Sequence, residues 1–188
     1  MQPVRLQSIY QQVSHLLAAW SLVLFAWIFF IATRNCWVDR IFCGMDKAYV
    51  THKYLSIAAL ALVWIHKLTI DLGKIRVVRT VKAEAPRLFG VKISDIGEGA
   101  GEYSLLLFSG LAVLAVVAVK LDYQKWKLLH KLMLIPFILG VVHYSISSRY
   151  LVFALNPFSL WMIFVIAAGV LSAVYSVFFY ESSAFRTR

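Results

Sequence analysis

Four histidines lie in two apolar segments of the chain. His52 and His66 lie in one segment, His130 and His143 lie in another, and one further apolar segment separates the two. Histidine is a common axial ligand of haem iron, and it binds the metal as neutral imidazole through one ring nitrogen. Two parallel helices that each carry two of these histidines could therefore share two haems.

Helix geometry supports this arrangement for the first pair. The 14 residues from His52 to His66 advance about 1400°, roughly 40° short of four turns, and rise roughly 21 Å. Both imidazoles then lie on one helix face but in opposite leaflets. Since one iron cannot take two ligands roughly 21 Å apart, each haem must be shared with a histidine of the other segment.

The second pair requires a distortion of its helix. The 13 residues from His130 to His143 rise about 19.5 Å but turn about 1300°, so a regular helix would point the two rings apart. Pro136 and Gly140 lie between them. A proline inside a helix removes a backbone hydrogen bond and clashes with the carbonyl one turn earlier. We therefore expect a kink or a change of winding that brings His143 round to the haem-binding face.

The composition indicates that a lipid bilayer surrounds most of the chain. Hydrophobic residues make up 61% of the sequence, charged residues only 15%, and the mean hydropathy is +0.76. A spanning helix needs about 20 mostly apolar residues. Five segments meet this condition: 9–33, 50–70, 103–120, 128–148 and 157–180. We predict an all-α integral membrane bundle of about five transmembrane helices, forming one domain over residues 1–188, with two haems between the second and fourth helices.

Local signals mark some helix ends. Asn156 followed by Pro157 is a cap and then a proline at the first helical position, which predicts the start of the fifth helix. Gly97, Gly99 and Gly101 are interpreted as a flexible loop before the third helix. The first segment shows no small-residue cleavage site, so we expect a retained span and not a removed signal peptide.

The number of spans decides which histidines meet. The second and fourth segments have one span between them, so they run in the same direction. His52 and His130 then lie near helix starts at one membrane face, while His66 and His143 lie toward the other face. The sequence predicts one haem between His52 and His130 and a second haem between His66 and His143.

The basic residues favour one orientation slightly. One membrane side holds residues 34–49, 120–127 and the C-terminal tail. Of the 19 Lys and Arg residues, ten lie on this side, counting lysines next to the histidines, and nine lie on the other side. The positive-inside rule then favours a cytoplasmic C-terminus, and we expect the bacterial inner membrane. The net charge of +10 is spread over both faces, which is expected for contacts with lipid headgroups and haem propionates and not for nucleic acid.

The stretch from Arg34 to Lys67 and the later histidine helix resemble the ferric reductase transmembrane domain family, which includes the NADPH oxidases. Family members share an Arg before a Trp-containing loop, an Asp shortly before the first histidine, a His-x13-His helix and a later His-x12-His helix. The resemblance covers most of the chain. The corresponding residues here are Arg34, Trp37, Asp46, His52 with His66, and His130 with His143.

This resemblance implies that the four histidines ligate two stacked b-type haems. It also implies FAD and NAD(P)H on a missing dehydrogenase domain or partner subunit at the cytoplasmic side, facing the loops 34–49 and 120–127 and the C-terminal tail. The expected activity is that of an NAD(P)H oxidase or ferric reductase, which reduces oxygen to superoxide, or ferric iron, on the far side. Superoxide-producing members tend to carry a further histidine one turn beyond the outer ligand, where this chain has Ile70.

Basic side chains near the histidines have two interpretations. Lys53, Lys67 and Lys131 each follow a histidine, and they could pair with haem propionates or extend toward the headgroups, as lysines at helix ends commonly do. The same alternatives apply to Arg34 and Arg149.

Three other polar residues favour structural roles. His15 has no partner at a matching spacing, which favours a polar contact over ligation. Cys36 and Cys43 lie in a loop placed on the cytoplasmic side, where thiols stay reduced.

Two other functions remain open at this point. One is a stand-alone haem electron-carrier subunit fed by a separate flavoprotein or by quinol, as in methionine sulfoxide reductase systems of the same superfamily. The other is a haem-free, His-lined transporter of metal or protons. Carboxylates are absent from 9–33, 103–120 and 128–180, which argues against a proton relay. In the haem interpretations, the basic loop 71–102 is expected over the far haem, where it would attract an anionic acceptor such as a ferric chelate or cover an oxygen site.

Overall fold

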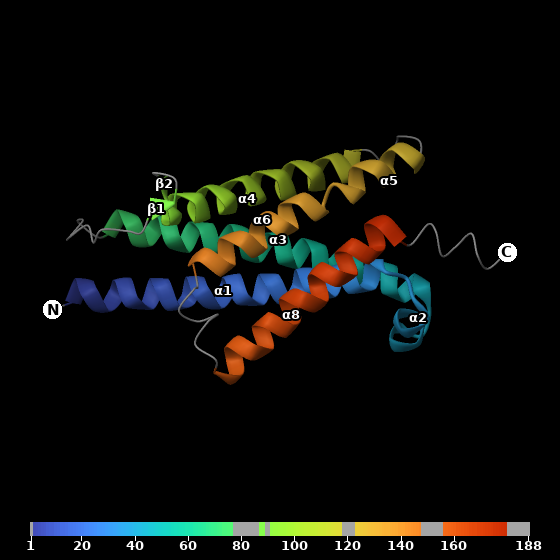
Figure 1. The fold of residues 1–188 in the computed structure, drawn as a ribbon, viewed down its shortest axis with the longest axis horizontal. Coiled ribbons are helices and arrows are strands. Elements are labelled where there is room, and N and C mark those ends of the chain that lie inside the picture. Colours follow the sequence, from blue (N-terminus) through green and yellow to red (C-terminus); the bar gives the residue numbers. More distant parts are fainter. Residues whose placement is uncertain (1, 77–86, 89–90, 118–122, 148–155, 180–188) are drawn as a thin grey trace.

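A computed structural model describes residues 2–76, 87–88, 91–117, 123–147 and 156–179, which form a bundle of helices (Figure 1). The long helices are α1 (Gln2–Ala32), α3 (Met45–Arg76), α4 (Ile93–Val117), α6 (Leu134–Ser147) and α8 (Pro157–Val174). The short elements are α2 (Cys36–Phe42), α5 (Tyr123–Lys131), a π-helical turn η2 (Tyr175–Phe179) and the antiparallel pair β1 (Arg87–Leu88) and β2 (Val91–Lys92).

Five stretches of helix in the described residues are long and apolar enough to cross a membrane. Their bounds are Ile9–Ala32, Met45–Gly73, Ile93–Val117, Gln124–Ser147 and Pro157–Phe179. The fourth stretch combines α5 and α6, and the fifth combines α8 with the π-helical turn. The predicted all-α membrane bundle of five helices is confirmed, with the second and third helices starting earlier than the hydropathy pattern indicated.

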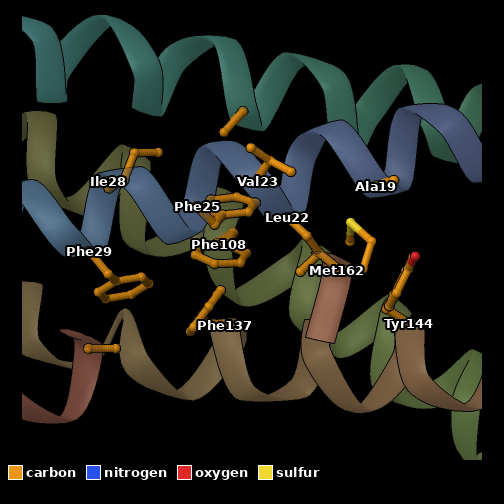
Figure 2. Close-up of a cluster of buried hydrophobic side chains, with 12 residues drawn as sticks. Ala19, Leu22, Val23, Phe25, Ile28, Phe29, Phe108, Phe137, Tyr144 and Met162 are labelled. Atoms are coloured by element: carbon orange, nitrogen blue, oxygen red, sulfur yellow. The ribbon is translucent and has the colours of Figure 1, made fainter. Parts of the chain in front are cut away.

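Helix α1 lies at the centre of the bundle. It packs along α3 on one flank and along α8 on another, while α4 pairs with α6. The core contains Phe25 of α1, whose ring stacks on that of Phe108 of α4 with a centroid distance of 4.3 Å, and Phe137 of α6, which lies 4.7 Å from the ring of Phe29 (Figure 2). These contacts tie α1, α4 and α6 into one apolar layer halfway along the bundle.

Helix α3 is the least buried of the five spans, although it carries two of the four histidines. It packs closely on α1 and on the short α2, it touches α4 at few points, and it hardly contacts α6. The approach of α3 to the α5–α6 segment is therefore made mainly by the paired histidines.

The interpretation of Gly97–Gly101 as a flexible loop is wrong, because these residues lie within helix α4. Glycine lowers helix propensity, but here it permits a close approach of α4 to α6. A Cβ at Gly97 would lie 2.7 Å from Ile146 Cγ2, and a Cβ at Gly101 would lie 2.6 Å from His143 Nδ1. Tertiary packing therefore outweighs the local preference of the glycines.

The expected distortion between His130 and His143 is present. The helix breaks at Leu132–Met133, where α5 ends and α6 begins, and Pro136 lies in the first turn of α6. The amides of Leu132 and Met133 donate to carbonyls three residues earlier, at 3.1 Å each. Such 3₁₀ steps turn about 120° per residue instead of about 100°, which supplies part of the rotation that a regular helix lacks.

The start of α8 also agrees with the prediction. The Asn156 side chain accepts a hydrogen bond of 2.8 Å from the Ser159 amide, and Pro157 occupies the first turn. This cap satisfies one of the free amides that every helix start presents.

Candidate functional site

The structure brings the four histidines together in two pairs at opposite ends of the bundle. The rings of His52 and His130 lie at a centroid distance of 6.1 Å, and so do the rings of His66 and His143. We call the first the C-side pair, because it lies at the end that holds α2, and the second the N-side pair, because it lies at the end where α1 begins (Figure 1). These are the pairs that topology predicted.

The separation within each pair suits two imidazoles that share one metal ion. Metal–imidazole bonds of about 2.0 Å put the two bound nitrogens about 4 Å apart on opposite sides of a metal. The ring centroids lie farther out at both ends, so a distance near the observed 6.1 Å is what such a pair requires. The residues present therefore fit a haem at each pair.

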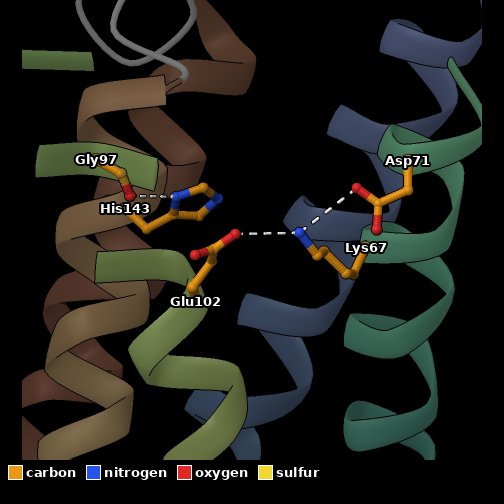
Figure 3. A network of polar contacts seen from close by, with 5 residues as sticks. All are labelled: Lys67, Asp71, Gly97, Glu102 and His143. Carbon is orange, nitrogen blue, oxygen red and sulfur yellow. Dashed lines mark hydrogen bonds and ion pairs between the residues drawn. The ribbon is translucent and has the colours of Figure 1, made fainter. Parts of the chain in front are cut away.

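The N-side rings are held by short hydrogen bonds at Nδ1. His66 Nδ1 lies 2.9 Å from the carbonyl oxygen of Ser14 and 2.9 Å from its hydroxyl oxygen. His143 Nδ1 lies 2.8 Å from the Gly97 carbonyl oxygen (Figure 3). Because a carbonyl can only accept, Nδ1 of both rings carries the proton. The Nε2 of each ring then keeps its lone pair for a metal.

The C-side rings are held less tightly. His52 Nδ1 donates to the Ile28 carbonyl at 3.2 Å. His130 Nδ1 is buried, and within the described part of the chain it has no hydrogen-bond partner. The Trp126 ring stacks on the His130 ring at a centroid distance of 4.9 Å, with 11° between the planes. Stacking thus orients the His130 ring where a hydrogen bond orients the other three.

The five basic residues singled out in the sequence differ in their surroundings. Lys67 bridges α3 and α4, with its Nζ 3.2 Å from Glu102 Oε1 and 3.5 Å from Asp71 Oδ1 (Figure 3). The exposed Lys53 lies over the Tyr54 ring, 6.0 Å from its centroid.

Arg34 is exposed between α1 and α2 with φ of 50°, and Lys131 ends α5. Arg149 lies outside the described residues. A contact of these five side chains with haem propionates stays a prediction.

Together with Ser14 and Gly97, Gly101 is one of the site residues that the sequence interpretation missed. The His143 ring rests against it, so any side chain there would displace the ring. The spacing of Gly97 and Gly101, four residues apart on one apolar helix, was an available signal, because small residues at this interval let membrane helices approach closely.

His15 and the two cysteines are not members of either pair, although His15 lies within electrostatic range of both N-side rings. His15 is half-buried on α1, next to the residue that holds His66. Cys36 and Cys43 are exposed free thiols at the two ends of α2. Their structural interpretation stays a prediction.

Comparison with known families adds an independent finding. A family model described as the ferric reductase like transmembrane component matches residues 17–141. The chain belongs to this family. The match extends from α1 into α6, contains His52, His66 and His130, and ends just before His143. Together with the five apolar helices, family membership identifies an integral, multi-pass membrane domain of oxidoreductase type. A search of the curated proteins gives no match to this chain.

Proposed function

We propose that this chain carries electrons across the membrane through two b-type haems, one held by each histidine pair. The supporting observation is the repeated geometry of the pairs, each with a centroid distance of 6.1 Å and each formed by one ring of α3 and one ring of the α5–α6 segment. Membership of a ferric reductase-like family suggests transmembrane electron transfer as well.

In this function the protein orients the imidazoles and fixes their protonation. Backbone carbonyls of α1 and α4 accept the Nδ1–H of three of the four rings, so Nε2 is the nitrogen offered to the metal. When bound, the haems would supply one-electron redox chemistry. Because both histidines of a pair would hold its haem, the haem would supply electrons to an acceptor that does not bind the metal.

The electron donor is proposed to act at the C-side pair. The resemblance noted from the sequence implies a flavin and NAD(P)H dehydrogenase domain or subunit on the cytoplasmic face, and the slight excess of basic residues favours the C-side as that face. Electrons would then leave from the N-side pair toward oxygen or ferric iron. A separate flavoprotein or quinol is the alternative donor, as in the stand-alone subunits of the superfamily.

The acceptor is proposed to approach the N-side end past the basic loop. The segment is not a loop throughout, because Lys74 and Arg76 lie in the last turn of α3, and Arg87 and Lys92 lie in the strand pair β1–β2. Arg79 and Lys82 lie outside the described residues. Neutralising the basic residues of the loop should raise the Michaelis constant for ferric citrate at low salt, because attraction of an anion weakens. An unchanged constant would contradict this role of the loop.

Spectroscopy of the purified protein tests the proposal. We expect a pyridine haemochrome assay in detergent to give two b haems per chain, with a fall in His52→Ala and in His143→Ala. The matched control is His15→Ala, which removes a half-buried membrane histidine outside the pairs and should keep both haems.

A colourless protein after haem-supplemented expression would contradict the proposal and favour the His-lined transporter. If the haems are present, their rate of reduction by a flavoprotein with NAD(P)H, compared with reduction by quinol, would distinguish the two donors.

A further inference from the structure

The two histidine pairs differ in the hydrogen bonds behind their rings. Both N-side rings donate from Nδ1 at short distances, 2.9 Å for His66 and 2.8 Å for His143. On the C-side, His52 donates at 3.2 Å, and the buried Nδ1 of His130 has no hydrogen-bond partner among the described residues. The asymmetry therefore involves both members of each pair.

Hydrogen bonds of this kind change the ligand strength of an imidazole. An acceptor at Nδ1–H draws the proton outward and leaves more electron density on the ring, which makes Nε2 the more basic ligand. A more basic ligand favours the oxidised, more positive state of the metal that it binds, and so lowers the reduction potential. The N-side imidazoles are thus the more basic ligands, and a metal held by them has the lower reduction potential.

A basic side chain acts on each pair of rings. On the N-side, the Lys67 ammonium, which forms ion pairs with Asp71 and Glu102, lies within electrostatic range of the His66 ring. On the C-side, the Arg34 guanidinium lies within electrostatic range of both rings. Negative charge favours an oxidised metal and positive charge a reduced one. Because a cation acts at both pairs and the exposed Arg34 is screened by solvent, the charges do not set the pairs apart, and the difference rests on the buried hydrogen bonds.

Gly101 and Gly97 keep the short bond of His143 in place. Gly97 provides the accepting carbonyl, and the missing side chain at Gly101 allows the His143 ring to approach α4. On the other ring of the pair, the buried Ser14 provides both a carbonyl and a hydroxyl. These three residues act on the metal site through the histidines.

We propose that Ser14, Gly97 and Gly101 are positioning residues that make the N-side site the lower-potential of the two haem sites, by at least tenfold in the reduction equilibrium. This inference rests on the proposed function, since it needs a haem at each pair. For a one-electron couple, tenfold corresponds to about 59 mV. Under partial reduction the electron then resides at the C-side site, and the N-side site presents the stronger reductant to the acceptor.

A redox titration of the purified haem-loaded chain, followed at the b-haem absorption band, tests the inference. We expect two one-electron waves whose reduction equilibria differ by at least tenfold. In His143→Ala or His66→Ala the low-potential wave should disappear while the high-potential wave persists. Loss of the high-potential wave in these variants, or a single unresolved wave in the wild type, would overturn the assignment. A chain without haem would instead refute the proposed function.

A glycine substitution provides the second variant, which keeps all four histidines. In Gly101→Ala the new Cβ would lie 2.6 Å from His143 Nδ1, so the ring must move away from α4 and its bond to the Gly97 carbonyl must lengthen. We expect the low-potential wave to shift upward or to be lost. The matched control is Gly99→Ala on the same helix, where a Cβ meets nothing within 4 Å and both waves should stay.

If Gly101→Ala changes only the high-potential wave, or neither wave, the positioning role is refuted. Electron paramagnetic resonance of the two oxidised, low-spin haems adds a readout that general destabilisation would not move. We expect Gly101→Ala to alter the signature of one haem and to leave the other unchanged.

Discussion

Replacing Gly169 by alanine tests the close contact of α8 with the rest of the bundle. A Cβ at this position would lie 2.9 Å from Ala26 Cβ, 3.1 Å from Ala26 Cα and 3.0 Å from Phe137 Cζ. Carbon atoms in favourable contact lie about 3.5–4.0 Å apart. The phenyl ring can tilt away, but the Ala26 atoms cannot rotate, so α8 must move outward from α1.

The expected magnitude follows from comparison with a second glycine. Gly110 of α4 has nothing within 4 Å of a Cβ, so Gly110→Ala gains helix propensity, up to about 1 kcal/mol, without a clash. The same gain applies to Gly169→Ala, and it cancels when the two variants are compared. Overpacking of a tight core costs about 1–3 kcal/mol, and we expect Gly169→Ala to be less stable than Gly110→Ala by that amount.

Unfolding in sodium dodecyl sulfate, titrated into mild detergent and followed by tryptophan fluorescence, measures the difference in free energy of unfolding. Haem content measured on the same samples should stay at the wild-type value, because α8 carries none of the paired histidines. A Gly169→Ala protein as stable as Gly110→Ala would refute the reasoning, since it would mean that α8 shifts at no cost.

Three further predictions concern the region around the histidines. Lys67→Gln should lower the free energy of unfolding by less than about 1 kcal/mol, because the Lys67 and Glu102 side chains are 32% and 65% exposed. A larger loss in the same detergent titration would contradict this and show that the ion pair holds α3 in place. Preparing the protein without haem should lower its stability, by about 2.7 kcal/mol for each of the two sites relative to haem at a hundredfold excess over Kd. Amide exchange should then rise first in α3; equal protection of α1 and α3 would contradict this. Pro136→Ala should restore a regular helix between α5 and α6 and turn His143 away from its partner, so the haem count should fall below two; an unchanged count and spectrum would assign the break to other contacts.

Most of the site could be predicted from the sequence, because its main constraints are local. Hydropathy and length define the spans, and the helical period together with the direction of each span determines which histidines meet. The kink before His143 followed from the same arithmetic, since a regular helix cannot place both rings of that segment on one face. Proline marked the region, although the break itself lies at Leu132–Met133.

Other features depend on partners that are distant in the chain. Nothing near His66 indicates that Ser14 holds its ring, because the two residues lie 52 positions apart. Gly97 and Gly101 looked like a loop because low helix propensity is a local property, whereas their contacts with α6 are tertiary. The difference between the two pairs likewise comes from backbone carbonyls, which the side-chain pattern does not reveal.

The sparse contact of α3 with α4 bears on how the protein is assembled in the cell. One flank of α3 is anchored on α1, while toward α4 it is linked by the Lys67–Glu102 bridge and by a hydrogen bond of 3.2 Å from the Trp64 indole to Ser109 Oγ. Separating α3 from α4 therefore breaks few contacts and leaves the layer of α1, α4, α6 and α8 intact. We expect that a flat, lipid-soluble cofactor can enter sideways from the bilayer after all five helices have been inserted, so that maturation needs no refolding of the membrane domain.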